Sequence, residues 1–325
     1  MKEIGGFFGL ELHRATEYYD DAIKVNSGRN AIKYILLAQK IRTVYIPYFI
    51  CETLIEPIKT LGITYRFYSI DAKLEIADIR PDMLLEGEKI LYINYFGVKN
   101  TYVDTLAELF GRQLIVDNTQ AFYKRPLKHT DTYYSPRKFF GVPDGGYLYT
   151  EPLLDEALEE DRSYDRCHAL LGGIDMDASS FYMEYIKHNE SLRGLPLKKM
   201  SRLTRALLSG VDYEEAKLIR ERNFLYLHNE LKTFNTLEIA YSQISGPMVY
   251  PLLIEIEGLR EYLIAQKIYV AIYWKEVSDY VGRPDTVEEK LTKYVHALPI
   301  DQRYGIGEMH RIAETVKRYI EGHRE

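Results

Sequence analysis

Cysteine, long apolar runs and basic blocks are scarce in this chain, and each scarcity excludes a class of protein. Two cysteines in 325 residues, Cys51 and Cys167, are too few and too far apart for a disulfide framework or a zinc site. No run of 18 or more apolar residues predicts a membrane-spanning helix. The formal net charge of −6 argues against a nucleic-acid binder, because such proteins concentrate Lys and Arg.

The composition that remains is that of a globular, soluble protein. Hydrophobic residues make up 46% of the chain and charged residues 28%, so the chain can bury a substantial core in one or two domains. The first residues, from Met1 to Arg14, lack the apolar segment of a secretory signal. We therefore expect a cytoplasmic protein with reduced thiols.

The first half of the chain alternates short apolar runs with segments of helical period. The apolar runs predict buried strands over residues 43–46, 64–68, 89–93 and 114–116. The periodic segments predict helices over residues 29–40, 53–61 and 103–110. This alternation predicts an α/β fold, with a mostly parallel sheet and helices on both of its faces.

The pattern changes near residue 210. A long charged helix is predicted over residues 213–232, with Glu, Lys and Arg on its outer face. Shorter elements follow over residues 249–256, 269–273 and 296–300, with helices over 259–266 and 308–321. We interpret this as a large domain, residues 1–210, and a smaller α+β C-terminal domain, residues 211–325, reached through the long helix.

The most informative stretch begins at the end of the fourth predicted strand. Asp117 follows that strand, Gln120 comes three residues later, and Lys138 precedes the turn Asp144-Gly145-Gly146. Ligands of parallel sheets bind beyond the carboxyl ends of the strands, which is where Asp117 falls. Pyridoxal 5′-phosphate requires a carboxylate for its pyridinium nitrogen, a donor for its phenolic oxygen and an amine for a Schiff base. The stretch therefore predicts that Lys138 carries this cofactor, which would make the chain an enzyme.

A phosphate site is predicted at the start of the first helix. Ser27 has the side chain of an N-cap, and the amides of Gly28 and Arg29 could donate to a phosphate at the positive end of the helix dipole. The hydroxyl of Ser135 could bind the same phosphate, although a serine beside proline is also typical of a turn. Each of these residues alone has a commoner structural role, as does a single surface lysine such as Lys138.

Seven short motifs occur in a fixed order along the chain. They are Ser27-Gly28-Arg29, Pro47 with Gly62 fifteen residues later, Asn94-Tyr95-Phe96-Gly97, Asp117 with Gln120, Lys138 before Asp144-Gly145-Gly146, Met200-Ser201 with Leu203, and Leu298-Pro299-Ile300. This set resembles the DegT/DnrJ/EryC1/StrS family of pyridoxal-phosphate-dependent sugar aminotransferases, from about residue 20 to the C-terminus. The resemblance implies fold type I, with a large three-layer domain that contains a mostly parallel sheet and a smaller C-terminal domain.

The resemblance also implies roles for the candidate residues. Lys138 matches the lysine that forms the Schiff base and then acts as acid and base. Asp117 matches the partner of the pyridinium nitrogen, and Gln120 matches the residue beside the phenolic oxygen. Gly28 and Arg29 match the backbone amides under the phosphate.

Some positions depart from the family's pattern. Ser135 resembles the phosphate-binding serine, but in most members that serine stands further upstream of the lysine. Asp144 replaces the usual glutamate, and the chain is shortened around the Lys138 turn and between Lys232 and Pro251. Where Cys51 stands, most members have an aromatic residue that stacks on the pyridine ring. Either a neighbour covers the ring or the cofactor is held less tightly; the neighbours are Tyr48, Phe49, Tyr95 and Phe96.

The expected activity is transfer of an amino group from an amino acid, with glutamate as the expected donor, to a keto sugar linked to a nucleotide. Two alternatives stay open: a dehydratase or lyase with the same cofactor, and a degenerate or regulatory member without catalysis. Lys138 argues against the dehydratase, because the family's dehydratases have histidine there. The resemblance further implies a homodimer with shared sites, for which residues 189–205 have the composition of an interface loop.

Cations for a nucleotide diphosphate are available, although each could equally be a solvated surface charge. They are Lys124, Arg125, Arg137, Arg193 and Lys198. The 29 tyrosines could line a carbohydrate site, but packing is the commoner role of tyrosine.

Overall fold

A seven-stranded sheet occupies the first half of the chain in the computed structural model, which describes residues 4–176, 178–282 and 285–323. The strand order is β1-β7-β6-β5-β4-β2-β3. The strands are β1 Ile23–Val25, β2 Thr43–Pro47, β3 Thr64–Tyr68, β4 Lys89–Ile93, β5 Leu114–Asp117, β6 Asp131–Tyr134 and β7 Gly146–Tyr149. Only β7 runs against the others, pairing antiparallel with β1 and β6. Every residue of β4 and β5 is buried, as expected of central strands covered on both faces.

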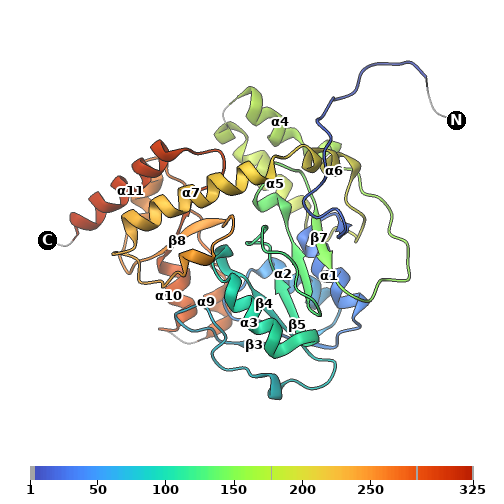
Figure 1. Cartoon of the computed structure of the whole chain (residues 1–325), viewed down its shortest axis with the longest axis horizontal. Coiled ribbons are helices and arrows are strands. Elements are labelled where there is room, and N and C mark those ends of the chain that lie inside the picture. Colours follow the sequence, from blue (N-terminus) through green and yellow to red (C-terminus); the bar gives the residue numbers. More distant parts are fainter. Residues whose placement is uncertain (1–3, 177, 283–284, 324–325) are drawn as a thin grey trace.

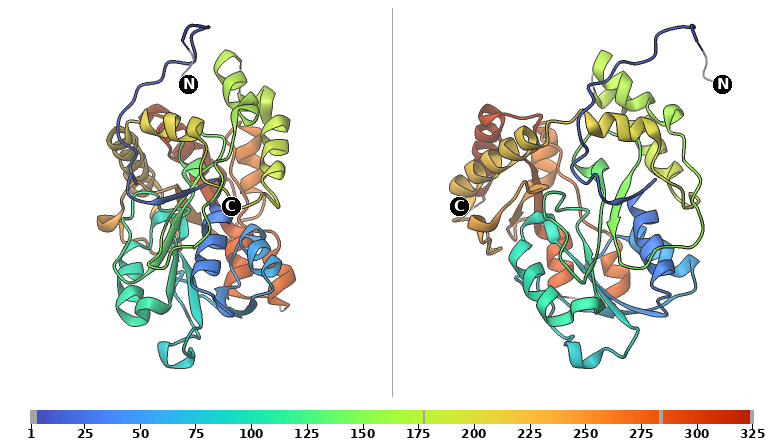
Figure 2. Two further views of the ribbon diagram at one scale, coloured as in Figure 1. Left: turned by 90° about the vertical axis from the view of Figure 1, so that its right-hand side faces the viewer. Right: turned by 45° about the vertical axis from the view of Figure 1, so that its right-hand side comes forward.

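Helices cover both faces of this sheet. Helix α1, Gly28–Ala38, and helix α2, Glu52–Thr60, lie on one face, and helix α3, Asn100–Phe110, lies on the other (Figure 2). The predicted α/β class and its mostly parallel sheet are therefore confirmed. Three short strands, β1, β6 and β7, were not predicted, because they have three or four residues and β6 begins with an aspartate.

Three helices follow the sheet and gather at one end of the molecule (Figure 1). They are α4 His168–Asp175, α5 Tyr182–Ser191 and α6 Arg202–Ser209. The N-terminal residues 4–14 form no helix or strand and run past this end, away from the sheet.

The last third of the chain is built on helix α7, Tyr213–Leu231, which begins at the N-cap Asp212. Strands β8 Val249–Leu253 and β9 Val295–Pro299 form an antiparallel pair. The remaining helices are α8 Leu259–Ala265, α9 Val277–Val281, α10 Val287–Tyr294 and α11 Ile306–Glu321, the last of which lies against α7 (Figure 1). The element expected over residues 269–273 is absent, and Ala271 makes only an isolated bridge to Ala297.

One hydrophobic core joins the two parts of the chain. Phe224 of α7 and Leu298 of β9 belong to the same buried cluster as Ile90 and Ile115 of the large sheet. The division into domains near residue 210 stays a prediction. A second cluster is mainly aromatic and contains Tyr19, Phe122, Tyr134, Phe139 and Tyr147 among others.

Packing therefore accounts for many of the tyrosines. The fully buried ones are Tyr19, Tyr68, Tyr92, Tyr95, Tyr133, Tyr134, Tyr147 and Tyr250. Among the described residues, no helix has both the length and the apolar character needed to cross a membrane.

Candidate active site

A cavity of about 970 Å³ lies at the carboxyl ends of the parallel strands. Strands β5 and β6 are parallel neighbours with Asp117 opposite Tyr133, so the segments that follow them emerge side by side. Strand β1 ends at the same edge, next to the start of β7. The fold thereby brings the six residues predicted for catalysis and cofactor binding to one cavity: Gly28, Arg29, Asp117, Gln120, Ser135 and Lys138.

Asp117 is buried and held at both carboxylate oxygens. Its Oδ1 accepts a hydrogen bond from the amide of Thr119 at 2.8 Å, and its Oδ2 accepts one from the hydroxyl of Tyr133 at 2.6 Å. Burial, and then the charge of Asp117, raise the pKa of Tyr133 well above its usual value, so the phenol stays a donor. A carboxylate has about four acceptor positions, so Asp117 can still accept a bond from a ring N–H in the cavity.

Lys138 lies on the turn that follows β6, and its side chain is exposed to the cavity. Its Nζ donates to Oγ1 of Thr119 at 3.0 Å. Thr119 thus contacts Asp117 through its amide and Lys138 through its hydroxyl. The contact places the amine beside the segment that carries the carboxylate.

Gln120 has one satisfied and one unsatisfied polar atom. Its Oε1 accepts a hydrogen bond from the amide of Phe96 at 2.6 Å. Its Nε2 is buried and has no hydrogen-bond partner among the described residues. An unpaired buried donor costs about 1–3 kcal/mol, so this amide nitrogen is suited to an acceptor on a bound molecule.

The start of α1 and the turn before Lys138 lie close together. A Cβ atom on Gly28 would lie 3.3 Å from Cβ of Ser135 and 3.5 Å from its Oγ. A Cβ atom on Gly146 would lie only 2.5 Å from the carbonyl oxygen of Ser27, so this position requires glycine. The paired glycines after Lys138 therefore let the Ser27–Gly28 backbone approach the lysine turn.

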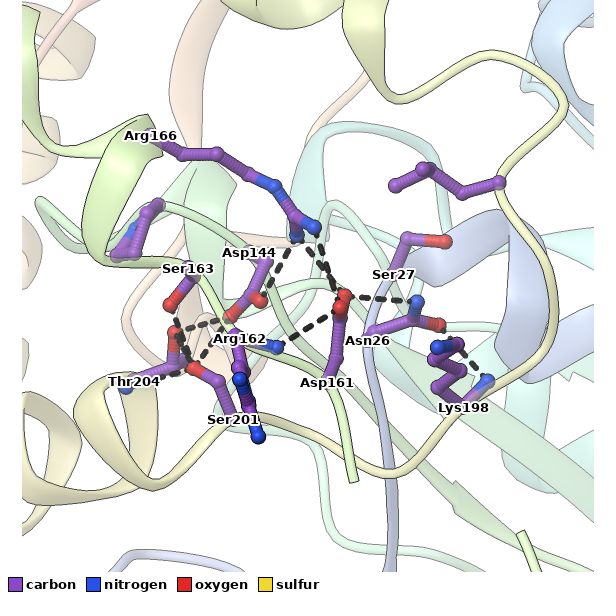
Figure 3. A network of polar contacts seen from close by, with 12 residues as sticks. Asn26, Ser27, Asp144, Asp161, Arg162, Ser163, Arg166, Lys198, Ser201 and Thr204 are labelled. Atoms are coloured by element: carbon purple, nitrogen blue, oxygen red, sulfur yellow. Dashed lines mark hydrogen bonds and ion pairs between the residues drawn. The ribbon is translucent and has the colours of Figure 1, made fainter. Parts of the chain in front are cut away.

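A buried polar network supports this approach from behind (Figure 3). Asp144 accepts a hydrogen bond from the hydroxyl of Thr204 and pairs with Arg166 at 3.3 Å. Arg166 also pairs with Asp161, which accepts a hydrogen bond from Asn26 at 3.0 Å. Burial raises the pKa of Asp144 from 3.8 to about 6, and Thr204 and Arg166 oppose the rise. The network links the loop before Gly28 to the turn after Lys138.

Part of the segment expected at a subunit interface contacts its own chain. The carbonyl oxygen of Pro196 accepts hydrogen bonds from the side chains of Asn26 and Asn30, at 3.1 and 3.0 Å. Residues 195–198 therefore help to hold the first turn of α1.

The sequence did not predict the rest of the cavity wall. We call the six predicted residues with Thr119 and Tyr133 the sheet wall. The outer wall is mainly aromatic and consists of Leu170, Phe181, Tyr182, Tyr185, Tyr269, Tyr273, Trp274 and Arg303. None of the four aromatic residues expected to cover the cofactor ring lies on the cavity: Phe49, Tyr95 and Phe96 are fully buried, and Tyr48 stacks on Phe67. Cys51 does line the cavity, and Trp274 supplies an aromatic ring to it.

Arg220 of α7 also differs from the expectation drawn from the sequence. It belongs to a helix whose charged residues were expected on the outside, yet it is 1% exposed and lines the cavity. Its Nη2 donates to the carbonyl oxygen of Phe139 at 3.3 Å, and Gln302 donates to the same oxygen at 2.8 Å. Burial lowers the pKa of Arg220 to about 10. Arg220 and Gln302 therefore fix the backbone directly after Lys138.

Of the five cations considered for a diphosphate, only Arg137 lines the cavity. The other four have partners elsewhere: Lys124 pairs with Asp104, Arg193 with Glu190, Lys198 with Glu159, and Arg125 lies over the ring of Tyr18.

Solved structures share this fold across most of their length. A DegT DnrJ EryC1 StrS aminotransferase from Brucella abortus is 19% identical over 92% of this chain and 85% of its own, with a TM-score of 0.60. NtdA from Bacillus subtilis with bound cofactor PMP is 16% identical over 92% and 73%, with a TM-score of 0.64. DesI in the presence of its TDP-sugar product is 18% identical over 94% and 83%, with a TM-score of 0.64. No protein-family model and no curated protein matches the sequence. The chain therefore has the fold of the DegT/DnrJ/EryC1/StrS aminotransferases.

Proposed function

We propose that this chain is a pyridoxal-phosphate-dependent aminotransferase of the DegT/DnrJ/EryC1/StrS family that transfers an amino group from an amino acid to a keto sugar. One observation carries the proposal: the amine of Lys138, the buried carboxylate of Asp117 and the unpaired amide nitrogen of Gln120 line the same cavity. The solved structures support it, because NtdA holds PMP and DesI was crystallised with a TDP-sugar product.

The cavity residues match the polar groups of the cofactor. Asp117 would keep the ring nitrogen protonated, with Tyr133 and the Thr119 amide holding the carboxylate in place. Gln120 Nε2 would donate to the phenolic oxygen and so gain the partner it lacks. The first turn of α1 and the hydroxyl of Ser135 would hold the phosphate. When bound, pyridoxal phosphate supplies the electron sink for the substrate's α-carbon.

Lys138 has two tasks in this proposal. Its Nζ would hold the cofactor covalently through the cofactor's aldehyde, and the same amine, once freed, would act as the base that takes the proton from the substrate's α-carbon and as the acid that gives it back. Thr119 keeps Nζ at the cavity through the 3.0 Å hydrogen bond. Arg220 and Gln302 keep the backbone of the following residue fixed.

The charge of the cavity favours anionic ligands. Five cationic side chains and two carboxylates line it, although the chain as a whole is negative: Arg29, Arg137, Lys138, Arg220 and Arg303, against Asp117 and Asp301. Glutamate as donor and a nucleotide-linked keto sugar as acceptor both carry negative charge. These substrates, a homodimer and a cytoplasmic location complete the proposal. Light scattering that gave a monomer at micromolar concentration would contradict the dimer.

The decisive experiment locates the cofactor on the chain. The protein is incubated with pyridoxal phosphate, reduced with borohydride and mapped by peptide mass spectrometry. We expect the adduct on Lys138. In a separate sample that is not reduced, we expect L-glutamate to bleach the visible absorbance. Lys138→Ala should lose the absorbance and all turnover, because no other group replaces the amine. Lys128→Ala, at an exposed lysine outside the cavity, should change neither. An adduct on another residue, or turnover by Lys138→Ala, would end the proposal.

A further inference from the structure

The residue directly before Lys138 is a cation in the cavity that forms no ion pair with a carboxylate of the described residues. Nη2 of Arg137 donates to Oδ1 of Asn189 at 2.6 Å. Its Nε is buried without a hydrogen-bond partner, and no carboxylate within the described ranges forms an ion pair with it. Burial lowers the pKa of Arg137. Leaving a buried charged donor unpaired is costly, so this guanidinium is suited to a bound anion.

A second guanidinium acts on the same region. Arg29 lines the same cavity. Burial is the largest cause of the lowered pKa of Arg137; the charge of Asp144 opposes it, and the charge of Arg29 adds a smaller lowering. Arg29 has its own carboxylate, because its Nε lies 3.2 Å from Oε2 of Glu56. Among the described residues, Arg137 donates a side-chain hydrogen bond only to the neutral amide of Asn189, and the carboxylate of Asp144 acts on it through charge alone. An anion bound beside Arg137 would favour its charged form.

Neutral donors for such an anion lie beside Arg137. The hydroxyl of Ser135, two residues earlier, forms no hydrogen bond with the described residues and lies near Gly28. Gly28 and Arg29 begin α1, where backbone N–H groups have no partner within the helix. The unpaired amide of Gln120, on the same cavity, independently indicates that this space takes a polar ligand.

We propose that Arg137 binds the phosphate monoester of the cofactor, together with Ser135 and the first turn of α1, and that Asn189 orients its guanidinium. This inference rests on the proposed function. A phosphate monoester carries a charge of about −1.5 to −2 at neutral pH, and arginine's planar set of donors matches its oxygens. The phosphate would then be neutralised from within one chain. The same chemistry could come from the phosphates of a nucleotide-linked sugar, so the experiment separates the two sources.

The experiment uses Trp274, which lines the cavity and is the chain's one tryptophan, as a fluorescent reporter of binding. Quenching is titrated with pyridoxamine 5′-phosphate and with pyridoxamine, which lacks the phosphate. Arg137→Met should weaken binding of the phosphorylated form ~10–100-fold, as expected for loss of a charge-assisted hydrogen bond. Binding of pyridoxamine should change by less than ~3-fold, because the ring contacts remain. Arg137→Lys should recover part of the loss, because it keeps the charge.

Two further variants control for net charge and for structure. Arg112→Met removes an exposed cation that pairs with Glu151 outside the cavity, and it should leave both affinities unchanged. Asn189→Leu removes the orienting hydrogen bond and should weaken binding of pyridoxamine 5′-phosphate less than Arg137→Met does. Circular dichroism would show whether each variant is folded, and Arg137→Lys tests the proposal should Arg137→Met not fold.

Several results would overturn the inference. If Arg137→Met lost affinity equally for both ligands, the arginine would have a structural role. If it kept its affinity for both, the arginine would have no role in binding. An unchanged affinity for pyridoxamine 5′-phosphate with a ~10-fold higher KM for a nucleotide-linked sugar would assign the arginine to the substrate instead. Failure of the unmodified protein to bind either ligand would instead reject the proposed function, and this inference with it.

Discussion

The sheet wall and the outer wall of the cavity differ in how firmly their side chains are held. Asp117, Gln120 and Tyr133 are buried, and their hydrogen bonds to the protein are 2.6–2.8 Å long. On the outer wall, Tyr182 and Tyr269 are 60% and 68% exposed. The first group comes from the adjacent parallel strands β5 and β6 and the turn directly after β5, and the second from α5 and the segment after α8.

This difference suggests a division of labour between the two walls. A rigid, buried set of polar groups is what chemistry at a cofactor ring needs, because small displacements of such groups cost rate. Exposed aromatic side chains on separate segments can change without disturbing that set. Within the proposed function, we therefore assign the reaction to the sheet wall and the choice of acceptor to the outer wall.

The largest effect is expected from Asp117→Ala on the sheet wall. Removing the carboxylate should lower kcat by on the order of 10²–10³-fold, because the ring nitrogen loses the charge that keeps it protonated. Asp117→Asn keeps the size of the side chain and one acceptor oxygen but not the charge, so it should show a loss of similar size. Steady-state kinetics with saturating cofactor would measure both. Full activity in either variant would move the chemistry away from this wall.

The same division explains what the sequence could and could not reveal. Asp117 was predicted because it ends β5, a strand with a clear apolar pattern, whereas Lys138 was predicted from the glycine turn that follows it and from the order of the family motifs. The parallel pairing of β5 with β6 then brings the two residues to one cavity. Tyr133 was missed because β6 has four residues and begins with Asp131, a buried aspartate that pairs with Lys89 at 2.8 Å. Such a strand has no apolar alternation to recognise.

The outer wall left no local signal at all. The segment expected as an element over residues 269–273 contributes Tyr269 and Tyr273 without forming a strand. Arg220 looked like one more charge on an exposed helix, whereas packing of α7 against the rest of the chain buries it. Both outcomes depend on tertiary contacts between distant segments, which periodicity does not encode.

A second test concerns the network behind the sheet wall. The pKa of Asp144 is about 6 in the folded protein against an ordinary 3.8. The folded state therefore binds the extra proton between about pH 4 and pH 6, and the stability it contributes is present below that window and lost as pH rises through it. At ~1.4 kcal/mol per pKa unit, the contribution is at most ~3 kcal/mol.

Asp144→Asn should remove this dependence, because the amide does not titrate. Urea unfolding of both proteins from pH 4 to pH 6.5 would measure it, as a difference in unfolding free energy that changes with pH by up to ~3 kcal/mol. Asp155→Asn, at an exposed position, should show the same change of unfolding free energy with pH as the unmodified protein. If the unfolding free energies of Asp144→Asn and the unmodified protein differed by the same amount at every pH, the Asp144 carboxyl would have an ordinary pKa in the folded state.

The smallest effect is expected from Tyr269→Ala on the outer wall. The side chain is 68% exposed and forms no hydrogen bond or ring contact with the part of the chain that the structure describes, so its loss should cost little stability. We expect KM for the sugar acceptor to rise by ~3–10-fold, the size of one aromatic contact, with kcat changed less than twofold. Tyr164→Ala, at a 76% exposed tyrosine outside the cavity, serves as the matched control. Quenching of Trp274 by pyridoxamine 5′-phosphate should be the same in both variants. If Tyr269→Ala instead weakened cofactor binding, the two walls would not act separately, because a residue assigned to substrate choice would be holding the cofactor.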